Sequence, residues 1–250
     1  MKPKVAVFSF TGCEGCSLAI LECEHELLDL LQHIEFVNFR EAMTEKRDDY
    51  DIALMDGSLS TPHDVEKARE IRSHAKLVVA IGACAHTGGV NAIKNRRGPL
   101  DQLMRDVYGE AGSQFRVLPA MPVSAAIPVD FAIPGCPISS AEFLEIVKDL
   151  LQGKTPKLPN YPVCVECKRK GNVCLYDQER DCMGVVARAG CDAICPSFGD
   201  PCEACRGYVD DPNTDSHQEV LRERGLTVEQ VLHRYTHYNA YDPETDRCLE

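Results

Sequence analysis

The sequence predicts an α/β fold in which helices cover both faces of a parallel sheet. Over the first 150 residues, short apolar runs alternate with longer stretches that place apolar residues at helical spacing. Three of the apolar runs also end in motifs rich in glycine and cysteine, where a loop would cross from a strand to a helix. Strands that alternate with helices in this way favour a parallel sheet covered on both sides.

The predicted elements follow one another from the N-terminus. Residues 5–10 form a short apolar strand, and residues 17–31 carry leucine and isoleucine at helical spacing. A second apolar run covers 52–55, a charged helical stretch covers 62–74, and a third strand covers 77–81. These segments predict the first part of an alternating order of strands and helices.

The remaining elements complete the alternation. The sequence predicts a helix from Pro99 to about Tyr108 and a strand over 131–133. Ser139 precedes Glu142 by three residues, which is the spacing of a capping box. The last helix of this region is therefore expected to begin just after Ser139, and Gly153 can close its far end.

Three cysteine motifs follow strands of the predicted sheet: TGCEGC, GACAHTGG and PGCP. Because ligands of open parallel sheets collect at the carboxyl ends of the strands, we expect these thiols to meet at one edge. Four thiolates suit a 4Fe-4S cluster, and the flanking glycines would give its inorganic core room. The alternative is that Cys84 and Cys136 are small buried residues at strand ends. The expected ligands are Cys13, Cys16, Cys84 and Cys136, with Gly12, Gly15, Gly88, Gly89 and Gly135 around them.

A second module is predicted after the proline-rich segment 153–162, which has no apolar periodicity. Eight of the 14 cysteines follow within 42 residues. Eight thiols make two four-thiolate sites, and so few apolar residues lie among them that bound metal must supply much of the stability. Zinc is the alternative to iron, although the CxxxCP spacing at 191–196 favours iron-sulfur sites. These cysteines are Cys164, Cys167, Cys174, Cys182, Cys191, Cys195, Cys202 and Cys205.

Composition and charge exclude several classes of protein. The 250 residues are 44% hydrophobic, which is enough for one or two ordinary globular domains. No secretory signal is visible and no apolar run approaches 18 residues, so we expect a cytoplasmic protein without a membrane span. In that compartment, clustered cysteines hold metal or carry out redox chemistry more often than they form disulfides. The net charge of −12 argues against a nucleic-acid partner.

These motifs together resemble the small, electron-transferring subunit of nickel-iron hydrogenases, and within it the cytoplasmic branch. The resemblance covers nearly the whole chain and rests on CxGC at 13–16, GxCxxxGG at 82–89, PGCP at 134–137 and the order of the eight later cysteines. It implies a flavodoxin-like domain over 1–152, a linker over 153–162 and a two-cluster domain over 163–250. The related quinone-reductase subunit of respiratory complexes is disfavoured, because it carries adjacent cysteines and lacks the eight-cysteine module.

The resemblance also assigns the ligands. It implies a proximal 4Fe-4S cluster on the four cysteines of the predicted sheet edge. Exported relatives usually have histidine where this chain has Cys164, and proline where it has Cys195. Three 4Fe-4S clusters of lower potential are therefore expected. The distal set would be Cys164, Cys167, Cys174 and Cys182, and the medial set Cys191, Cys195, Cys202 and Cys205.

The implied function is electron transfer without a catalytic residue in this chain. Hydrogen would be split at a nickel-iron centre in a separate large subunit, because every CxxC pair here already has a role. Further partners with flavin or iron-sulfur groups are expected, and deazaflavin, NAD(P), ferredoxin and a disulfide reductase all stay open as acceptors. The alternative is an iron-sulfur module of an oxidoreductase that is not a hydrogenase.

A few other residues have weaker claims to a role. Glu14, between two proposed ligands, either relays protons and tunes a cluster or simply faces the partner. His86 is a candidate for a supporting hydrogen bond near Cys84. Cys23 and Cys248 are not needed for the twelve ligands and are assigned to no metal. The acidic tail should contain a helix near Thr227 and tyrosines that pack on the cysteine-rich module or a neighbouring subunit.

Overall fold

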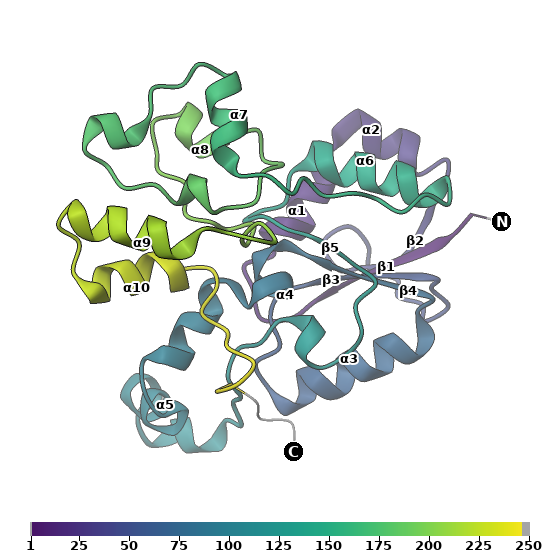
Figure 1. Ribbon diagram of the computed structural model, residues 1–250. Coiled ribbons are helices and arrows are strands. Elements are labelled where there is room, and N and C mark those ends of the chain that lie inside the picture. Colours follow the sequence, from purple (N-terminus) through teal and green to yellow (C-terminus); the bar gives the residue numbers. More distant parts are fainter. Residues whose placement is uncertain (1, 247–250) are drawn as a thin grey trace.

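The computed structural model describes residues 2–246 and contains a five-stranded parallel sheet (Figure 1). The strand order β2-β1-β3-β4-β5 is the flavodoxin-like order, so the predicted fold class is confirmed. Register is continuous between β1 and β3, where Val5 faces Ile52 and Ser9 faces Asp56. The strands are β1 (Lys4–Ser9), β2 (Glu35–Phe39), β3 (Ile52–Asp56), β4 (Leu77–Ile81) and β5 (Phe131–Ile133).

Helices cover the two faces of this sheet and bury alternate residues of each strand. On one face, α1 (Gly15–Leu21), α2 (Glu24–Leu30) and α6 (Ser140–Leu151) pack on side chains that include Val5 and Val7. On the other, α3 (Pro62–His74) packs on the intervening positions, which include Ala6 and Phe8. The period of two along β1 thus gives each face of the sheet its own apolar core.

Several predicted bounds agree with the structure, and some differ for identifiable reasons. The stretches 62–74, 77–81 and 131–133 form the predicted elements, and the next predicted helix is α5 (Leu100–Tyr108). The single helix predicted over 17–31 is wrong, because Glu24 has a φ of 45° that a continuous right-handed helix excludes. Strand β2 was not predicted, since EFVNF has neither a continuous apolar run nor clean alternation.

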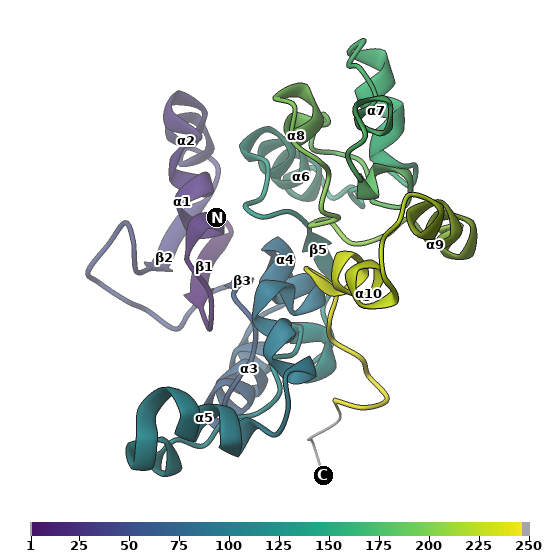
Figure 2. The same cartoon turned by 90° about the vertical axis from the view of Figure 1, so that its left-hand side faces the viewer.

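The cysteine-rich segment packs beside the carboxyl edge of the sheet, where Arg206 donates to the Pro134 carbonyl, and Figure 2 shows its green ribbon at the far end of the molecule from α5. Its apolar core is small and is built around Val163, Met183, Val186 and alanines. The predicted helix after Thr227 is present with a full capping box, whereas α9 was not predicted. Every helix in 2–246 is too short or too polar to cross a bilayer. The remaining helices are α4 (Gly82–Thr87), α7 (Val163–Arg169), α8 (Ile194–Ser197), α9 (Thr214–Glu223) and α10 (Val228–Thr236).

The capping box predicted at the start of α6 is only half formed. The Ser139 hydroxyl accepts a hydrogen bond from the Glu142 backbone N–H at 3.4 Å. The Glu142 carboxylate, however, accepts two hydrogen bonds from Arg206, at 2.7 and 2.8 Å. Arg206 is 2% exposed and also donates to the carbonyls of Pro134 and Ala189. One buried guanidinium therefore joins the sheet-edge loop, α6 and the cysteine-rich segment.

We expect Arg206→Ala to lower the free energy of unfolding by about 3–5 kcal/mol, because it leaves the Glu142 carboxylate buried and unpaired. Arg105→Ala is the matched control, since it removes an exposed helical ion pair with Asp101 and should cost about 1 kcal/mol or less. Urea denaturation of the metal-loaded protein measures both values. Equal losses in the two variants would show that the buried pair does not hold the two parts together.

Candidate metal-binding sites

Four thiols from three loops gather at the carboxyl edge of the sheet and form site 1, which is Cys13, Cys16, Cys84 and Cys136. Cys13 and Cys16 follow β1, Cys84 lies in α4 directly after β4, and Cys136 follows β5. Burial, and then the negative charges of Cys136, Asp56 and Cys13, raise the pKa of Cys84 to about 12. Burial and Asp56, then Cys136 and Cys84, likewise raise the pKa of Cys16. The four predicted sheet-edge cysteines are therefore neighbours in space.

Glycines make room for these sulfurs. Gly82 has a φ of +83°, and a Cβ at this position would overlap the Cys16 sulfur. A Cβ at Gly89, which has a φ of +56°, would lie 2.9 Å from the Cys84 sulfur. Of the glycines predicted to line the site, Gly15 and Gly89 contact ligand sulfurs in this way, while Gly82 was missed. Site 1 is thus shaped so that the thiols face space that side chains would otherwise fill.

Asp56 anchors the start of α1 beside site 1. Its carboxylate is 4% exposed and accepts hydrogen bonds from the backbone N–H and the hydroxyl of Ser17, at 3.1 and 2.9 Å. Burial raises the pKa of Asp56, although the bonds from Ser17 oppose that rise. Because Ser17 follows Cys16 directly, the bond across from β3 fixes the position of that thiol. No sequence motif pairs these two residues, which lie 39 positions apart.

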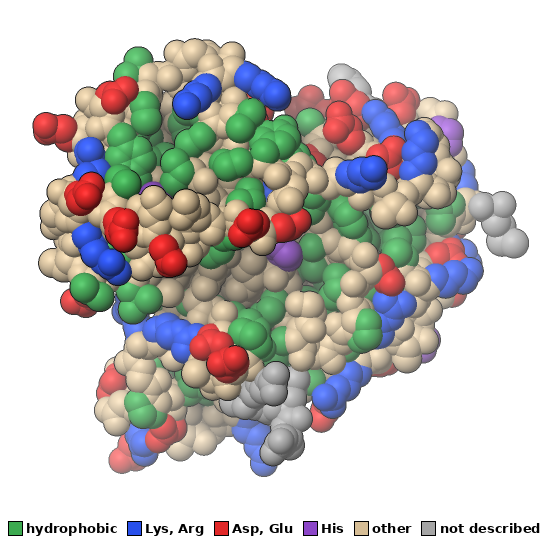
Figure 3. Space-filling model, viewed as in Figure 1, with side chains coloured by type: hydrophobic (Ala, Val, Ile, Leu, Met, Phe, Trp, Pro, Cys, Tyr) green, Lys and Arg blue, Asp and Glu red, His purple; other side chains and the backbone are tan. Residues whose placement is uncertain are grey.

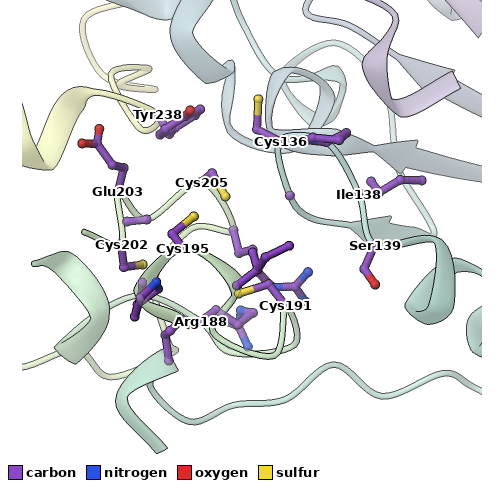
Figure 4. Close-up of a pocket in the computed structure, with 18 of the residues that line it drawn as sticks. Cys136, Ile138, Ser139, Arg188, Cys191, Cys195, Cys202, Glu203, Cys205 and Tyr238 are labelled. Carbon is purple, nitrogen blue, oxygen red and sulfur yellow. The ribbon is translucent and has the colours of Figure 1, made fainter. Parts of the chain in front are cut away.

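Site 2 comprises Cys191, Cys195, Cys202 and Cys205, whose sulfurs surround a cavity of about 590 Å³ (Figure 4). Burial raises the pKa of Cys205 to about 12, and Cys191 and Cys195 contribute to the rise. Cys136 of site 1 also lines this cavity. The cavity is mainly apolar, so charge held inside it would be shielded from water.

Site 3 comprises Cys164, Cys167, Cys174 and Cys182. Burial, and then the other three thiols, raise the pKa of Cys164 to about 11. A Cβ at Gly184 would lie 3.4 Å from both the Cys164 and the Cys182 sulfur, so this glycine leaves the space between them open. The Asn172 side-chain amide donates to the Cys167 sulfur at 3.6 Å. Neither Gly184 nor Asn172 was predicted, because neither belongs to a cysteine spacing motif.

Direct contacts join the three sites in the order 1, 2, 3. The Cys205 thiol of site 2 forms a hydrogen bond with the backbone of Cys136 in site 1. The backbone N–H of Cys202 in site 2 donates to the Cys182 sulfur of site 3 at 3.3 Å. The twelve thiols therefore lie in one series rather than in three separate places.

The donor chemistry of the sites fits iron-sulfur clusters. Each site offers four thiols and no nitrogen donor from the predicted set, and thiolates are the ligands that such clusters prefer. The glycine positions at sites 1 and 3 and the cavity at site 2 leave room for a group larger than one ion. Within residues 2–246, no three His, Cys, Asp or Glu side chains stand close enough to hold a single metal ion. The four-thiol donor sets and the space beside them thus fit an iron-sulfur cluster.

Glu14 and His86, the other two candidate residues, lie next to charged groups. Glu14 has a left-handed φ of 64° and pairs with the exposed Arg40. Burial lowers the pKa of His86, as do the positive charges of Arg188 and Arg206, and its ring lies near Gly207.

The structure also shows the environment of Cys23 and of the tyrosines in the C-terminal tail. Cys23, which was assigned to no metal, is a buried thiol, and Cys248 lies outside the described residues. The tail tyrosines pack on this chain, where Tyr235 bonds His217 and Tyr238 contacts Cys136.

Residues 13–150 match the family described as "NADH ubiquinone oxidoreductase, 20 Kd subunit". This match spans the loops of site 1 and ends before Cys164. The description names the kind of relative that the CxxC spacing disfavoured, whereas the curated relatives described below are hydrogenase subunits.

Two curated relatives extend the similarity beyond the sheet, and one solved structure is similar over part of the chain. Sulfhydrogenase 2 subunit delta of Pyrococcus furiosus is 39% identical over 223 residues, which cover 88% of this chain and 92% of that protein. One subunit of the vhu F420-non-reducing hydrogenase from Methanococcus voltae is 33% identical over 242 residues, with 84% of each chain covered. A chain of the NAD⁺-reducing [NiFe]-hydrogenase in the H₂-reduced state superposes with a TM-score of 0.57 at 28% identity, over 64% of this chain and 96% of that chain. The matches to the two curated relatives are long enough to include part of the cysteine-rich segment.

We expect Gly82→Ala to prevent metal loading at site 1, because the new methyl group would displace the Cys16 sulfur. The loss should be about four iron atoms per chain, as a 4Fe-4S cluster holds four. Iron and acid-labile sulfide analysis of the purified protein measures it.

Gly225→Ala is the control for this substitution. Gly225 has a similar φ of +91° but nothing within 4 Å of the added Cβ, so the variant carries the same backbone strain without the overlap. Full iron content in both variants would contradict the role of Gly82.

Proposed function

This chain belongs to the family of the NADH ubiquinone oxidoreductase 20 kDa subunit and, within it, to the small subunits of nickel-iron hydrogenases, and from this we propose that it relays electrons through three 4Fe-4S clusters. As a hydrogenase subunit it is part of an oxidoreductase and is not catalytic without its large subunit. The observation that carries the proposal is the series of three four-thiol sites joined by the contacts of Cys205 and Cys202.

We propose that site 1 holds the proximal cluster, site 2 the medial cluster and site 3 the distal cluster. A bound 4Fe-4S cluster would accept and return one electron at a time. The chain itself supplies thiols, open space beside glycines and a fixed spacing between sites. The division into 1–152, the linker 153–162 and 163–250 is proposed on the same basis, since site 1 lies in the first part and the other sites in the second.

The proposed partner is a large subunit that holds the nickel-iron centre with its own cysteines. All twelve cysteines of sites 1 to 3 have a role, and the thirteenth described thiol, Cys23, is buried against Ala19 and Ser140. Cys13 and Cys136 of site 1 are exposed in the isolated chain, which supports a partner that covers them. Glu14, beside Cys13, is placed to contact that partner or to tune the site by its charge.

Cys164 and Cys195 supply thiols at the two positions where exported relatives carry histidine and proline. Thiolate ligation at every site should hold the potentials low, which suits exchange with a pyridine-nucleotide diaphorase, a deazaflavin enzyme or a ferredoxin-linked partner in the cytoplasm. The other candidate is an iron-sulfur module that serves a large subunit without nickel. The names of the relatives favour the hydrogenase, because both are hydrogenase subunits.

We expect the chain, purified anaerobically with its large subunit, to contain about twelve iron and twelve sulfide per copy and to couple hydrogen oxidation to reduction of methyl viologen. Metal analysis and a viologen assay under hydrogen measure these properties. An iron content near four would remove sites 2 and 3 from the electron path. A large subunit without its own two CxxC pairs, identified by mass spectrometry of the native complex, would favour the module that is not a hydrogenase.

We expect Cys164→His to retain the site 3 cluster with a changed reduction potential, because imidazole can replace thiolate at iron. Redox titration followed by electron paramagnetic resonance measures the potential and the amount of each cluster. Cys23→Ser is the control, and it should leave all three signals unchanged because Cys23 belongs to no site. Complete loss of one signal in Cys164→His would show that site 3 cannot accept the exchange.

A further inference from the structure

We propose that a basic stripe at the end of α7, formed by Lys168, Arg169 and Lys170, docks an acidic electron-carrier protein next to site 3. The inference rests on the proposed function and deepens it, because it names the kind of partner that takes electrons from the chain. The candidate acceptors include small nucleotides, and a protein is favoured because an exposed apolar side chain, Val173, accompanies the charges.

The stripe lies directly beside the thiols of site 3. Lys168 follows Cys167 in sequence, and it lies close enough to Cys164 for its positive charge to oppose part of the rise in the pKa of that thiol, which burial dominates. The loop after the stripe holds Asn172 against the Cys167 sulfur and ends at Cys174, which is exposed. A protein bound to the stripe would therefore lie within a few side chains of site 3.

The charges of the stripe are available for a partner. Lys168, Arg169 and Lys170 are all exposed. Lys170 pairs with Asp192 at 2.6 Å, and the Arg169 guanidinium lies 5.9 Å from the centroid of the Tyr161 ring. Among the described residues, no acidic side chain pairs with Lys168 or Arg169. Two positive charges thus stay without an acidic partner at the surface.

Exposed apolar side chains accompany the charges. Val173 is 64% exposed and lies between the stripe and Cys174, and Val185 is also exposed. Figure 3 shows basic side chains beside hydrophobic ones at the top of the molecule, over the end of α7. An apolar patch within a charged rim is the composition of transient protein interfaces.

The charge of the whole chain selects the kind of partner. The net charge is −12, so an acidic protein is repelled by most of this surface and attracted where consecutive positive side chains stand out. Complementary charge of this kind raises the rate of association and fixes the orientation of the partner. An acidic carrier would then arrive with site 3, rather than another part of the chain, facing it.

The test measures binding between the anaerobic complex with its large subunit and an acidic plant-type ferredoxin, by surface plasmon resonance at several salt concentrations. We expect the double variant Lys168→Glu/Arg169→Glu to weaken the wild-type Kd by about ten-fold or more at low salt, chiefly through a slower association rate. The neutral variant Lys168→Gln/Arg169→Gln should lose less. The matched control Lys67→Glu/Arg69→Glu makes the same charge change at exposed positions of α3 and should leave Kd within about two-fold.

Failure of the docking inference differs from failure of the proposed function. Hydrogen-dependent viologen reduction and iron content report on the function and should be unchanged in the variants. With these intact, a Kd that does not respond to the stripe, or responds equally to the α3 control, overturns the inference. The inference is also overturned if wild type fails to bind ferredoxin but binds phosphatidylglycerol vesicles through the stripe.

Discussion

The spacing of the thiol sites depends on one buried guanidinium, that of Arg206. Its side chain binds the Glu142 carboxylate and the carbonyls of Pro134 and Ala189. Pro134 precedes Cys136 of site 1 by two residues, Ala189 precedes Cys191 of site 2 by two, and Arg206 itself follows Cys205. A change at this contact therefore moves two sites relative to each other. Gly190 accommodates the guanidinium, because a Cβ there would overlap it.

The cysteine-rich segment shows how a region with little apolar core can still be specific. Its buried cluster consists mostly of alanines and valines around Met183. Burial raises the pKa of Cys164, Cys202 and Cys205, so these thiols hold their protons until a metal group displaces them. Because the thiols occupy the interior that apolar side chains would fill elsewhere, we expect metal binding and folding of this segment to be coupled.

The sequence carried enough information for the strands and for the grouping of thiols, and too little for the contacts that position them. Apolar runs such as 77–81 can be recognised locally, and the topology of a parallel sheet then brings Cys84 and Cys136 together. The partner of Glu142 lies 64 residues away, and the capping-box spacing predicts a local bond instead. Gly82 and Gly184 likewise acquire meaning only when a sulfur from another segment approaches them. Long-range partners of this kind leave no periodicity in a single sequence.

Charge acts on a partner of this molecule in two ways, through the net charge of the whole chain and through single unpaired side chains at contact. Physiological salt screens all charges of the chain over roughly 8 Å, so the net charge of −12 repels an acidic partner mainly when the partner is already near the surface. At contact, single unpaired groups dominate, and Lys168 and Arg169 stand beside the exposed Cys174. The net negative charge of the chain thus disfavours most orientations of an acidic protein. The unpaired positive charges of the stripe stabilise the orientation that contacts them. Because the same stripe borders site 3, the orientation that charge selects is also the one with the shortest path to the thiols.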